Sequence, residues 1–192
     1  MRAAPVGVLY PSTRLDELIR GAYECAIPTH GGQMAICAAA AVAGAVSAAL
    51  DGRPIGDVLT VAVRASAEAE SLRPYGGGST IAASIQQTYI DLAKRSHLAV
   101  DELANRYFPN KPQNIVPLAI GLALVTQSAQ QTALLAANIG GDSDSVASIG
   151  GAIAGALHPE TVNDEWFNVV NLVNADGLVE AAASLATLRR KS

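Results

Sequence analysis

Residues 137–156 have the sequence ANIGGDSDSVASIGGAIAGA, which places two glycines and two acids directly before an uncharged run of small side chains. Gly140 and Gly141 leave the backbone free to turn sharply, because glycine adopts conformations that other residues avoid. The run after them lacks bulky side chains, so a helix built from it can approach its neighbours closely. The stretch therefore predicts a tight turn leading into a buried helix, with Asp142 and Asp144 in its first turn.

The composition of the whole chain favours the same helical architecture. Half of the 192 residues are hydrophobic, but only 4% are aromatic. Strong helix formers dominate, and the sequence has no long alternating runs of β-branched residues, which are typical of strands. We therefore expect an all-α fold of about ten helices joined by short connections. Since no linker or internal repeat divides the chain, residues 1–192 are expected to form one compact multi-helix domain.

The longest apolar run covers residues 34–50, MAICAAAAVAGAVSAAL, and carries no charge. A membrane-spanning helix needs ~20 predominantly apolar residues, and this run is shorter. Alanine, which fills most of it, also contributes little hydropathy. We therefore predict a buried central helix here and no membrane partner.

Capping residues and prolines predict where several helices begin. Ser12 or Thr13 is expected to cap a helix that runs to about Ala26. Pro117 is expected in the first turn of a helix over residues 114–126, where proline is tolerated because its missing N–H has no partner to lose.

The charge distribution argues against nucleic acid as a partner. The formal net charge is −4, and the sequence contains no extended basic cluster. Residues 189–191, Arg-Arg-Lys, stand at the end of a predicted helix, where cations complement the helix dipole. We therefore expect no nucleic-acid binding.

Cysteine usage and the start of the chain indicate the cellular compartment. Cys25 and Cys37 show no paired metal spacing, and two thiols in a chain of this size do not suggest a secreted disulfide scaffold. Pro5 and Pro11 interrupt any apolar core of a signal peptide. The expected compartment is the reducing cytoplasm.

The two aspartates permit two physical interpretations. Oxygens of Asp142, Asp144 and Ser145 can converge above the start of the predicted helix, and hard cations such as Mg²⁺, Mn²⁺ and Ca²⁺ prefer such ligands. Aspartate and serine are also favoured helix caps, and acids in a first turn suit the helix dipole. Taken alone, these residues leave both interpretations open.

A longer stretch of the sequence resembles a known protein family. Residues 136–157, AANIGGDSDSVASIGGAIAGAL, resemble the C-terminal metal motif of the ADP-ribosylglycohydrolase family, usually Asn-Leu-Gly-Gly-Asp-Ser-Asp-Thr before a small-residue helix. The resemblance continues through residues 116–138 and 164–190. It includes the start, MRAAPVGVLYP, and a Thr-His pair before the alanine-rich helix in residues 28–52. It thus covers nearly the whole chain.

This resemblance implies an all-helical hydrolase that holds two Mg²⁺ or Mn²⁺ ions and cleaves the N- or O-glycosidic bond to ADP-ribose. It implies that Asp142, Asp144 and Ser145 are metal ligands, with Ser145 in place of the usual threonine. Gly140 and Gly141 would form the turn at the ligand.

The resemblance also points to residues around the ligand. It places His30 where it can face the ligand, although His30 could instead simply close the junction of two helices through a backbone hydrogen bond. The loop over residues 73–80 could border the site with Tyr75 as a stacking ring, or Tyr75 could be an ordinary exposed aromatic.

Several family motifs have no counterpart in this sequence. The Gly-Asp start, the Thr-Asp-Asp motif and the Gly-Asn-Gly loop, which supply the other metal ligands and cradle the diphosphate, are absent. The resemblance therefore implies the C-terminal portion of the domain, lacking the N-terminal part and supplying only some of the ligands. Such a chain is expected to be a poor catalyst alone. Its uncovered apolar helix faces are expected to bind a partner, either a separately encoded N-terminal half or a second copy of this chain.

Three functions follow as hypotheses. The first is an ADP-ribosylglycohydrolase-type enzyme, active when completed. The second is a non-catalytic binding module that keeps the fold and a partial metal site. The third is a structural helical domain whose aspartates act only as caps, and the length of the family resemblance speaks against it.

Overall fold

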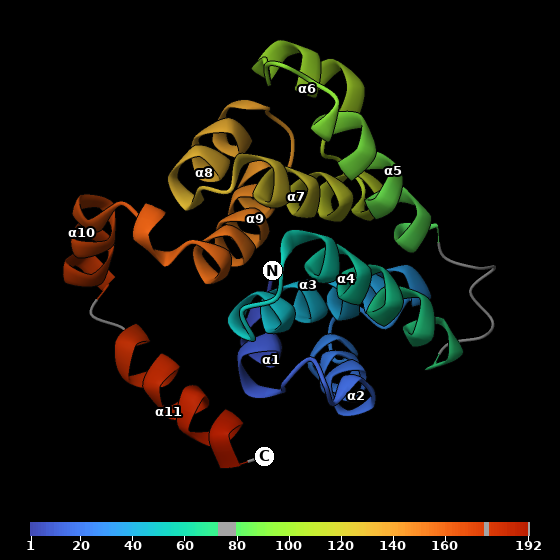
Figure 1. The fold of residues 1–192 in the computed structure, drawn as a ribbon, viewed down its shortest axis with the longest axis vertical. Coiled ribbons are helices and arrows are strands. Elements are labelled where there is room, and N and C mark those ends of the chain that lie inside the picture. The colour runs from blue at the N-terminus through green and yellow to red at the C-terminus, as the bar shows by residue number, and fades with distance from the viewer. Residues whose placement is uncertain (73–79, 175–176, 192) are drawn as a thin grey trace.

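A computed structural model describes residues 1–72, 80–174 and 177–191, and Figure 1 shows its arrangement. Over these residues the secondary structure consists of α-helices and two 3₁₀ turns, with no strand. This confirms the predicted all-α class. The α-helices are α1 (Ala4–Leu9), α2 (Leu15–Ala26), α3 (Gln33–Leu50), α4 (Ile55–Ala69), α5 (Ile81–Ala93), α6 (Val100–Tyr107), α7 (Pro112–Thr126), α8 (Ala129–Asn138), α9 (Ser143–Leu157), α10 (Asp164–Asn174) and α11 (Leu178–Lys191).

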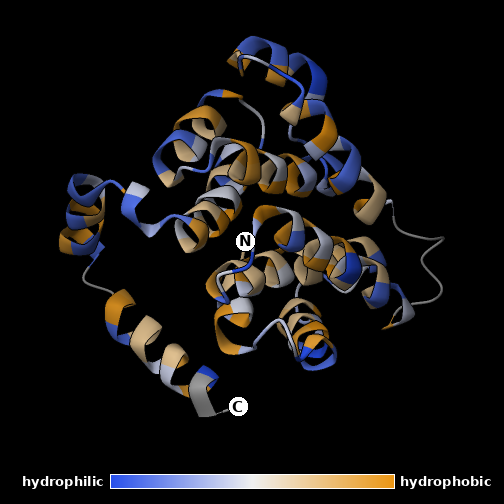
Figure 2. Cartoon of the chain, in the orientation of Figure 1, coloured by the Kyte–Doolittle hydropathy of each residue, from blue (hydrophilic) through white to orange (hydrophobic). Residues whose placement is uncertain are grey.

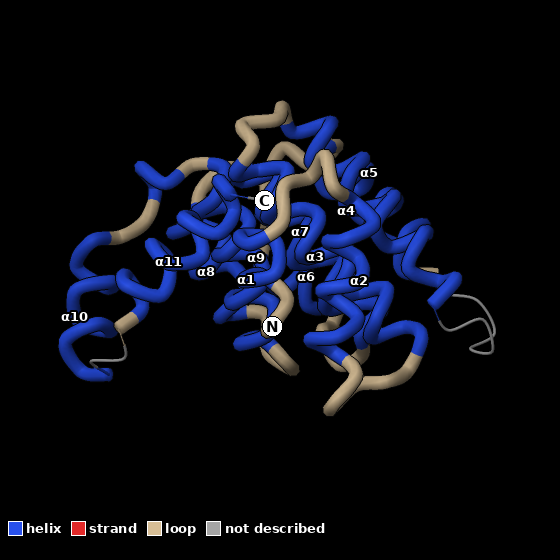
Figure 3. Tube along the Cα trace, turned by 90° about the horizontal axis from the view of Figure 1, so that it is seen from below, coloured by secondary structure: helices blue, strands red, loops and turns tan. Residues whose placement is uncertain are grey.

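Helix α3 is the centre of the fold and confirms the predicted buried helix. It packs against α1, α2, α4, α7 and α9, and these helices surround it in the two views of Figures 1 and 3. By length and composition α3 would pass as a membrane span, but 78% of it is buried inside the protein. Burial of this extent is what a core helix shows, and such a helix needs no lipid to cover it.

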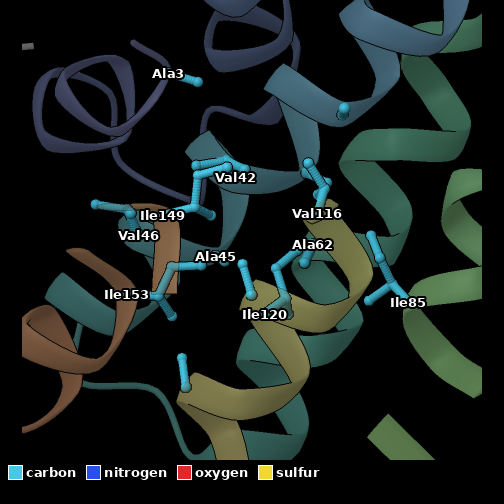
Figure 4. Close-up of a cluster of buried hydrophobic side chains, with 14 of the residues drawn as sticks. Ala3, Val42, Ala45, Val46, Ala62, Ile85, Val116, Ile120, Ile149 and Ile153 are labelled. Carbon is cyan, nitrogen blue, oxygen red and sulfur yellow. The ribbon is translucent and has the colours of Figure 1, made fainter. Parts of the chain in front are cut away.

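The hydrophobic core lies where α3, α7 and α9 meet. Figure 4 shows Val42 and Val46 of α3 beside Ile149 and Ile153 of α9, with Ile120 of α7 on another side. All five side chains are nearly or fully buried. Burying side chains of this size stabilises the fold by about 1.5–3 kcal/mol each, which fixes α9 and therefore the turn that precedes it.

The small residues of α9 have different roles along the helix. A Cβ added at Gly150 would lie 2.6 Å from Cγ2 of Thr132 in α8 and 3.1 Å from the carbonyl oxygen of Ala119 in α7. A Cβ at Gly151 would meet nothing within 4 Å. The predicted close approach is therefore confirmed at Gly150, while Gly151 faces open space.

The N-terminal segment corrects the sequence prediction. Residues 4–9 form α1, with Pro5 in its first turn, where a proline loses no hydrogen bond. Neither Ser12 nor Thr13 caps α2, which begins after Arg14 without a side-chain cap. Ser12 instead donates from its backbone N–H and its hydroxyl to Oδ2 of Asp51, at 2.9 Å and 2.6 Å. Ser12 thus ties the segment before α2 to the end of α3.

The position of Pro117 is also corrected. Helix α7 begins at Pro112, two residues earlier than predicted, so Pro117 lies inside the helix and beyond the first turn. Pro112 itself occupies the first turn, where its fixed φ suits helix initiation.

Helices α10 and α11 extend away from this core. Figure 1 shows α10 at the edge of the molecule and α11 running back toward α1, and Figure 2 shows many hydrophobic positions along both. Helix α10 contributes no buried residue, and Leu172 is 82% exposed. The other exposed apolar residues of α10 are Trp166, Phe167, Val169, Val170 and Val173.

Arg189 joins α11 to the rest of the protein. Its guanidinium donates to the carbonyl oxygens of Gly7 and Tyr10 and to that of Ser47, and it pairs with Oδ1 of Asp51 at 2.5 Å. These carbonyls lie at the C-terminal ends of α1 and α3. Of the predicted basic residues, Arg189 thus complements the C-terminal ends of two other helices, while the side chains of residues 190 and 191 lie outside what the structure describes.

Candidate functional site

The turn before α9 needs both of its glycines. Gly140 and Gly141 have φ values of +84° and +60°, a region that other residues rarely adopt. A Cβ at Gly141 would also lie 2.6 Å from the carbonyl oxygen of Pro109. That same oxygen accepts a hydrogen bond from the backbone N–H of Asp142 at 2.7 Å. The turn is therefore held against the loop before α7, and it fixes the position of Asp142.

The side chain of Asp142 does not serve as a helix cap. Asp142 is the residue before α9, but its side chain accepts no backbone hydrogen bond from the first turn. Its Oδ1 instead accepts from the hydroxyl of Ser145 at 2.8 Å. The capping interpretation is thus wrong for Asp142, whose other oxygen, Oδ2, is not engaged in this bond.

A cavity of about 390 Å³ brings together two parts of the site predicted from distant segments. Asp142 and Ser145 line it from the start of α9, and His30 lines it from the junction of α2 and α3. Apolar side chains form much of its wall: Ala3, Ala22, Ala38, Val42, Val116 and Ile149. Four of these, Ala3, Val42, Val116 and Ile149, are labelled in the core of Figure 4, so the cavity rests directly on the core.

The remaining predicted residues stand outside this lining. Asp144, Gly140 and Gly141 are exposed at the turn and do not line the cavity. Tyr75 and the loop around it lie outside the described residues. The cavity therefore groups Asp142, Ser145 and His30, while Asp144 lies one residue away from it on the same turn.

Met1 and Arg2 also belong to the lining of this cavity. The Asp142 carboxylate brings negative charge to the same space, as a cation site requires.

Of the two roles considered for His30, the structure shows the backbone hydrogen bond, and the ligand role stays a prediction. The backbone N–H of His30 donates to the carbonyl oxygen of Ala26 at 2.8 Å, which closes the end of α2. His30 also lines the cavity, and its Nδ1 lies 2.8 Å from the hydroxyl oxygen of Thr29. The backbone hydrogen bond thus fixes the main chain while the imidazole remains available to a ligand.

Arg2 is a cavity residue that sequence analysis missed. Its guanidinium donates to the carbonyl oxygen of Cys25 at 3.3 Å and to the hydroxyl of Thr29. Nothing in the sequence near Arg2 indicates this, because its partners lie more than twenty positions away. Its one available signal was its place in the starting segment, which resembles the part of the family that follows a glycine-rich ligand loop.

The donor set suits a hard cation but does not complete a site. Carboxylate and hydroxyl oxygens of Asp142 and Ser145 are the ligands that Mg²⁺ and Mn²⁺ prefer. Within the part of the chain that the structure describes, however, no three His, Cys, Asp or Glu side chains gather closely enough to hold an ion. The residues present therefore fit part of a coordination shell.

Comparison with known proteins identifies the family. The family model described as ADP-ribosylglycohydrolase matches residues 1–192. The chain belongs to the ADP-ribosylglycohydrolase family. It is also similar to a relative from Escherichia coli strain K12, the uncharacterized protein YegU, with 27% identity over 196 aligned residues. The alignment covers all of this chain and 59% of YegU, so the chain spans less than two thirds of that relative's length.

Proposed function

We propose that this protein provides the cation-binding part of a hydrolase that cleaves the glycosidic bond to ADP-ribose. Membership of the ADP-ribosylglycohydrolase family supports a glycohydrolase function. The observation that carries the proposal is the shared cavity, where the hydrogen-bonded pair Asp142 and Ser145 faces the same space as His30. A glycohydrolase needs both a polar cluster and a partly dry pocket, and this cavity offers the two together.

In this proposal each side chain has a defined task. Asp142 and Ser145 hold a Mg²⁺ or Mn²⁺ ion, with Asp144 as a further ligand from the same turn. A bound ion would supply Lewis-acid chemistry at this point, for orientation of the ribose and activation of a water molecule. His30 contacts a ribose or phosphate oxygen from the opposite segment. The apolar wall excludes bulk water, which strengthens polar interactions inside the cavity.

The ligand set explains why the activity needs a complement. Three side chains supply too few oxygens for ions that take about six, so an ion held by this chain alone stays largely hydrated and weakly bound. We propose that residues equivalent to the part of YegU that this chain does not match supply the rest of the coordination shell.

The proposal is tested by calorimetric titration of Mn²⁺ and Mg²⁺, each with and without ADP-ribose. We expect weak binding of metal that ADP-ribose strengthens, and a loss of about tenfold or more in Asp142→Ala. Asp164→Ala is the control, because Asp164 is an acid at the start of α10 that does not line the cavity. Its affinity for metal should equal that of the wild type.

Two results would contradict the proposal in different ways. Equal metal binding by Asp142→Ala and the wild type would place the ion elsewhere. Binding of ADP-ribose with no effect of metal would favour the alternative, a non-catalytic binding module that keeps the family fold.

The exposed apolar surface of α10 supports the need for a partner. Six large apolar residues are exposed on this one short helix, and extended exposed apolar surface is uncommon on isolated soluble proteins. We expect the purified chain to self-associate as its concentration rises, and Leu172→Glu to shift it toward the monomer. Light scattering at several concentrations measures this, with Asn171→Glu on the same helix as the control. If the wild type stays monomeric at every concentration, α10 does not mediate self-association.

A further inference from the structure

The rim of the cavity holds a short chain of polar contacts that neither the family nor the proposed function assigns. Arg2 donates through its guanidinium to the hydroxyl oxygen of Thr29, and that oxygen lies 2.8 Å from Nδ1 of His30. Arg2 and His30 both line the cavity. Three residues from two segments thus form one linked unit that ends at the imidazole.

The chemistry of each group sets the direction of these hydrogen bonds. A guanidinium has five N–H donors and no acceptor, so the hydroxyl oxygen of Thr29 must be the acceptor toward Arg2. A hydrogen bond from a cation draws electron density from that oxygen, which makes the hydroxyl a stronger donor and a weaker second acceptor. The single hydroxyl hydrogen of Thr29 is therefore best directed at Nδ1 of His30.

This direction decides which nitrogen of His30 carries the proton. A neutral imidazole has one N–H and one unprotonated nitrogen, and the hydrogen bond made by one nitrogen selects the state of the other. Because Nδ1 accepts from Thr29, the proton of neutral His30 sits on Nε2. His30 then offers an N–H donor and no free acceptor.

We propose that Arg2 is a positioning residue that acts through Thr29 to hold His30 as its Nε2–H tautomer, so that His30 donates a hydrogen bond to a phosphate oxygen of the ligand. The identity of that ligand rests on the proposed function, whereas the Arg2–Thr29–His30 relay stands on the contacts alone. Phosphate oxygens only accept hydrogen bonds when ionised, so the tautomer decides whether His30 favours or repels them. The nearby Arg2 cation adds a positive potential at the same rim.

The tautomer is measured in the free protein by long-range ¹H–¹⁵N NMR of the histidine rings. The chain has three histidines, so the ring signals are few enough to assign by substitution. We expect the Nε2–H pattern for His30 in the wild type. In Thr29→Val and in Arg2→Met it should change toward the mixture of an unrestrained ring, while Thr29→Ser should keep the wild-type pattern.

His97 serves as the internal control in every spectrum, because it lies outside this cavity and should not respond. An Nδ1–H pattern in the wild type would overturn the relay. So would an unchanged His30 pattern in a folded Thr29→Val protein. If Thr29 had only a structural role, Thr29→Ser would not keep the wild-type NMR pattern of the His30 ring nitrogens.

Binding of ADP-ribose in the presence of Mn²⁺ tests the consequence. Loss of one directed hydrogen bond should weaken binding about five- to tenfold in Thr29→Val, with recovery in Thr29→Ser. If the tautomer responds as expected but no variant or wild type binds ADP-ribose, the relay is supported and the proposed function fails. If all variants bind equally while the tautomer changes, His30 does not donate to the ligand and that part of the inference is wrong.

Discussion

Replacement of Gly7 by alanine is expected to lower the free energy of unfolding by about 2–3 kcal/mol, although alanine favours helices over glycine. Helix α1 packs against α3 through this glycine. An added Cβ would overlap the carbonyl oxygen of Ala43 and would lie only 2.9 Å from Cβ of Val46. Both neighbours belong to the buried central helix, so α1 must move instead.

Movement of α1 should also reach the cavity. The residues directly before α1, Met1 to Ala3, line it together with Val42 of α3. We therefore expect Gly7→Ala to weaken metal and ADP-ribose binding as well as stability. A shift of α1 changes the position of Arg2 relative to Thr29 on the rim.

Thermal unfolding followed by circular dichroism measures the first effect. For a chain of this size the expected loss corresponds to a Tm lower by about 5–10 °C. Gly151→Ala is the control, because a Cβ at that helical position meets open space. It should raise stability by up to about 1 kcal/mol. A Gly7→Ala protein as stable as the wild type would show that α1 is loosely packed against α3.

Local sequence rules were sufficient where the structure is decided by neighbouring residues. Alanine-rich composition and the spacing of glycine and proline located most helices, including the buried α3. The same rules gave no helix for residues 4–9, because Pro5 was considered only as evidence against a signal peptide. A proline in a first turn starts a helix rather than breaking it.

Prediction of the candidate site depended on the family resemblance and not on local sequence rules. The spacing of Asp142, Asp144 and Ser145 suggested a metal without excluding a cap. Only the family resemblance connected them with His30, and the structure places His30 on the same cavity as Asp142 and Ser145. Helical periodicity cannot predict such a meeting, because it arises from how α2, α3 and α9 pack.

The tertiary contacts of single long side chains could not be predicted from the sequence. Arg2 donates a hydrogen bond to Thr29, which follows α2 in the sequence. Arg189, near the other end of the chain, donates one to Asp51. A lone arginine carries no pattern in sequence, and its partner is set by tertiary packing alone.

Removal of the Arg189 side chain is expected to cost about 2–4 kcal/mol of stability and to release α11. The Arg189 side chain is only 14% exposed, and it satisfies carbonyl oxygens at the ends of α1 and α3 as well as Asp51. Hydrogen bonds from a charged group to partly buried acceptors are worth more than neutral ones, and their loss leaves those acceptors unpaired.

Hydrogen exchange and thermal unfolding of Arg189→Ala test this expectation. Amides of α11 should lose protection, while those of α3 should keep most of theirs. Arg64→Ala is the matched control, since Arg64 pairs with Glu68 on an exposed helix surface where an ion pair contributes about 0.5 kcal/mol or less. Unchanged protection of α11 in Arg189→Ala would show that apolar contacts with α1 hold it without the arginine.

The contact between Arg189 and Asp51 also predicts how the free energy of unfolding depends on pH in the acid range. Burial alone would raise the pKa of Asp51, but hydrogen bonds from Ser12 and Arg189 outweigh it and hold the pKa below its ordinary value of 3.8. Because the carboxylate is more acidic in the folded protein, its stabilising contribution is present above pH 3.8 and is lost as the pH falls through the lower folded value. Arg189→Ala removes one source of that shift, while Ser12 remains. Its stability should therefore fall less steeply than that of the wild type in this acid range, and a parallel fall would mean that Ser12 alone sets the acidity of Asp51.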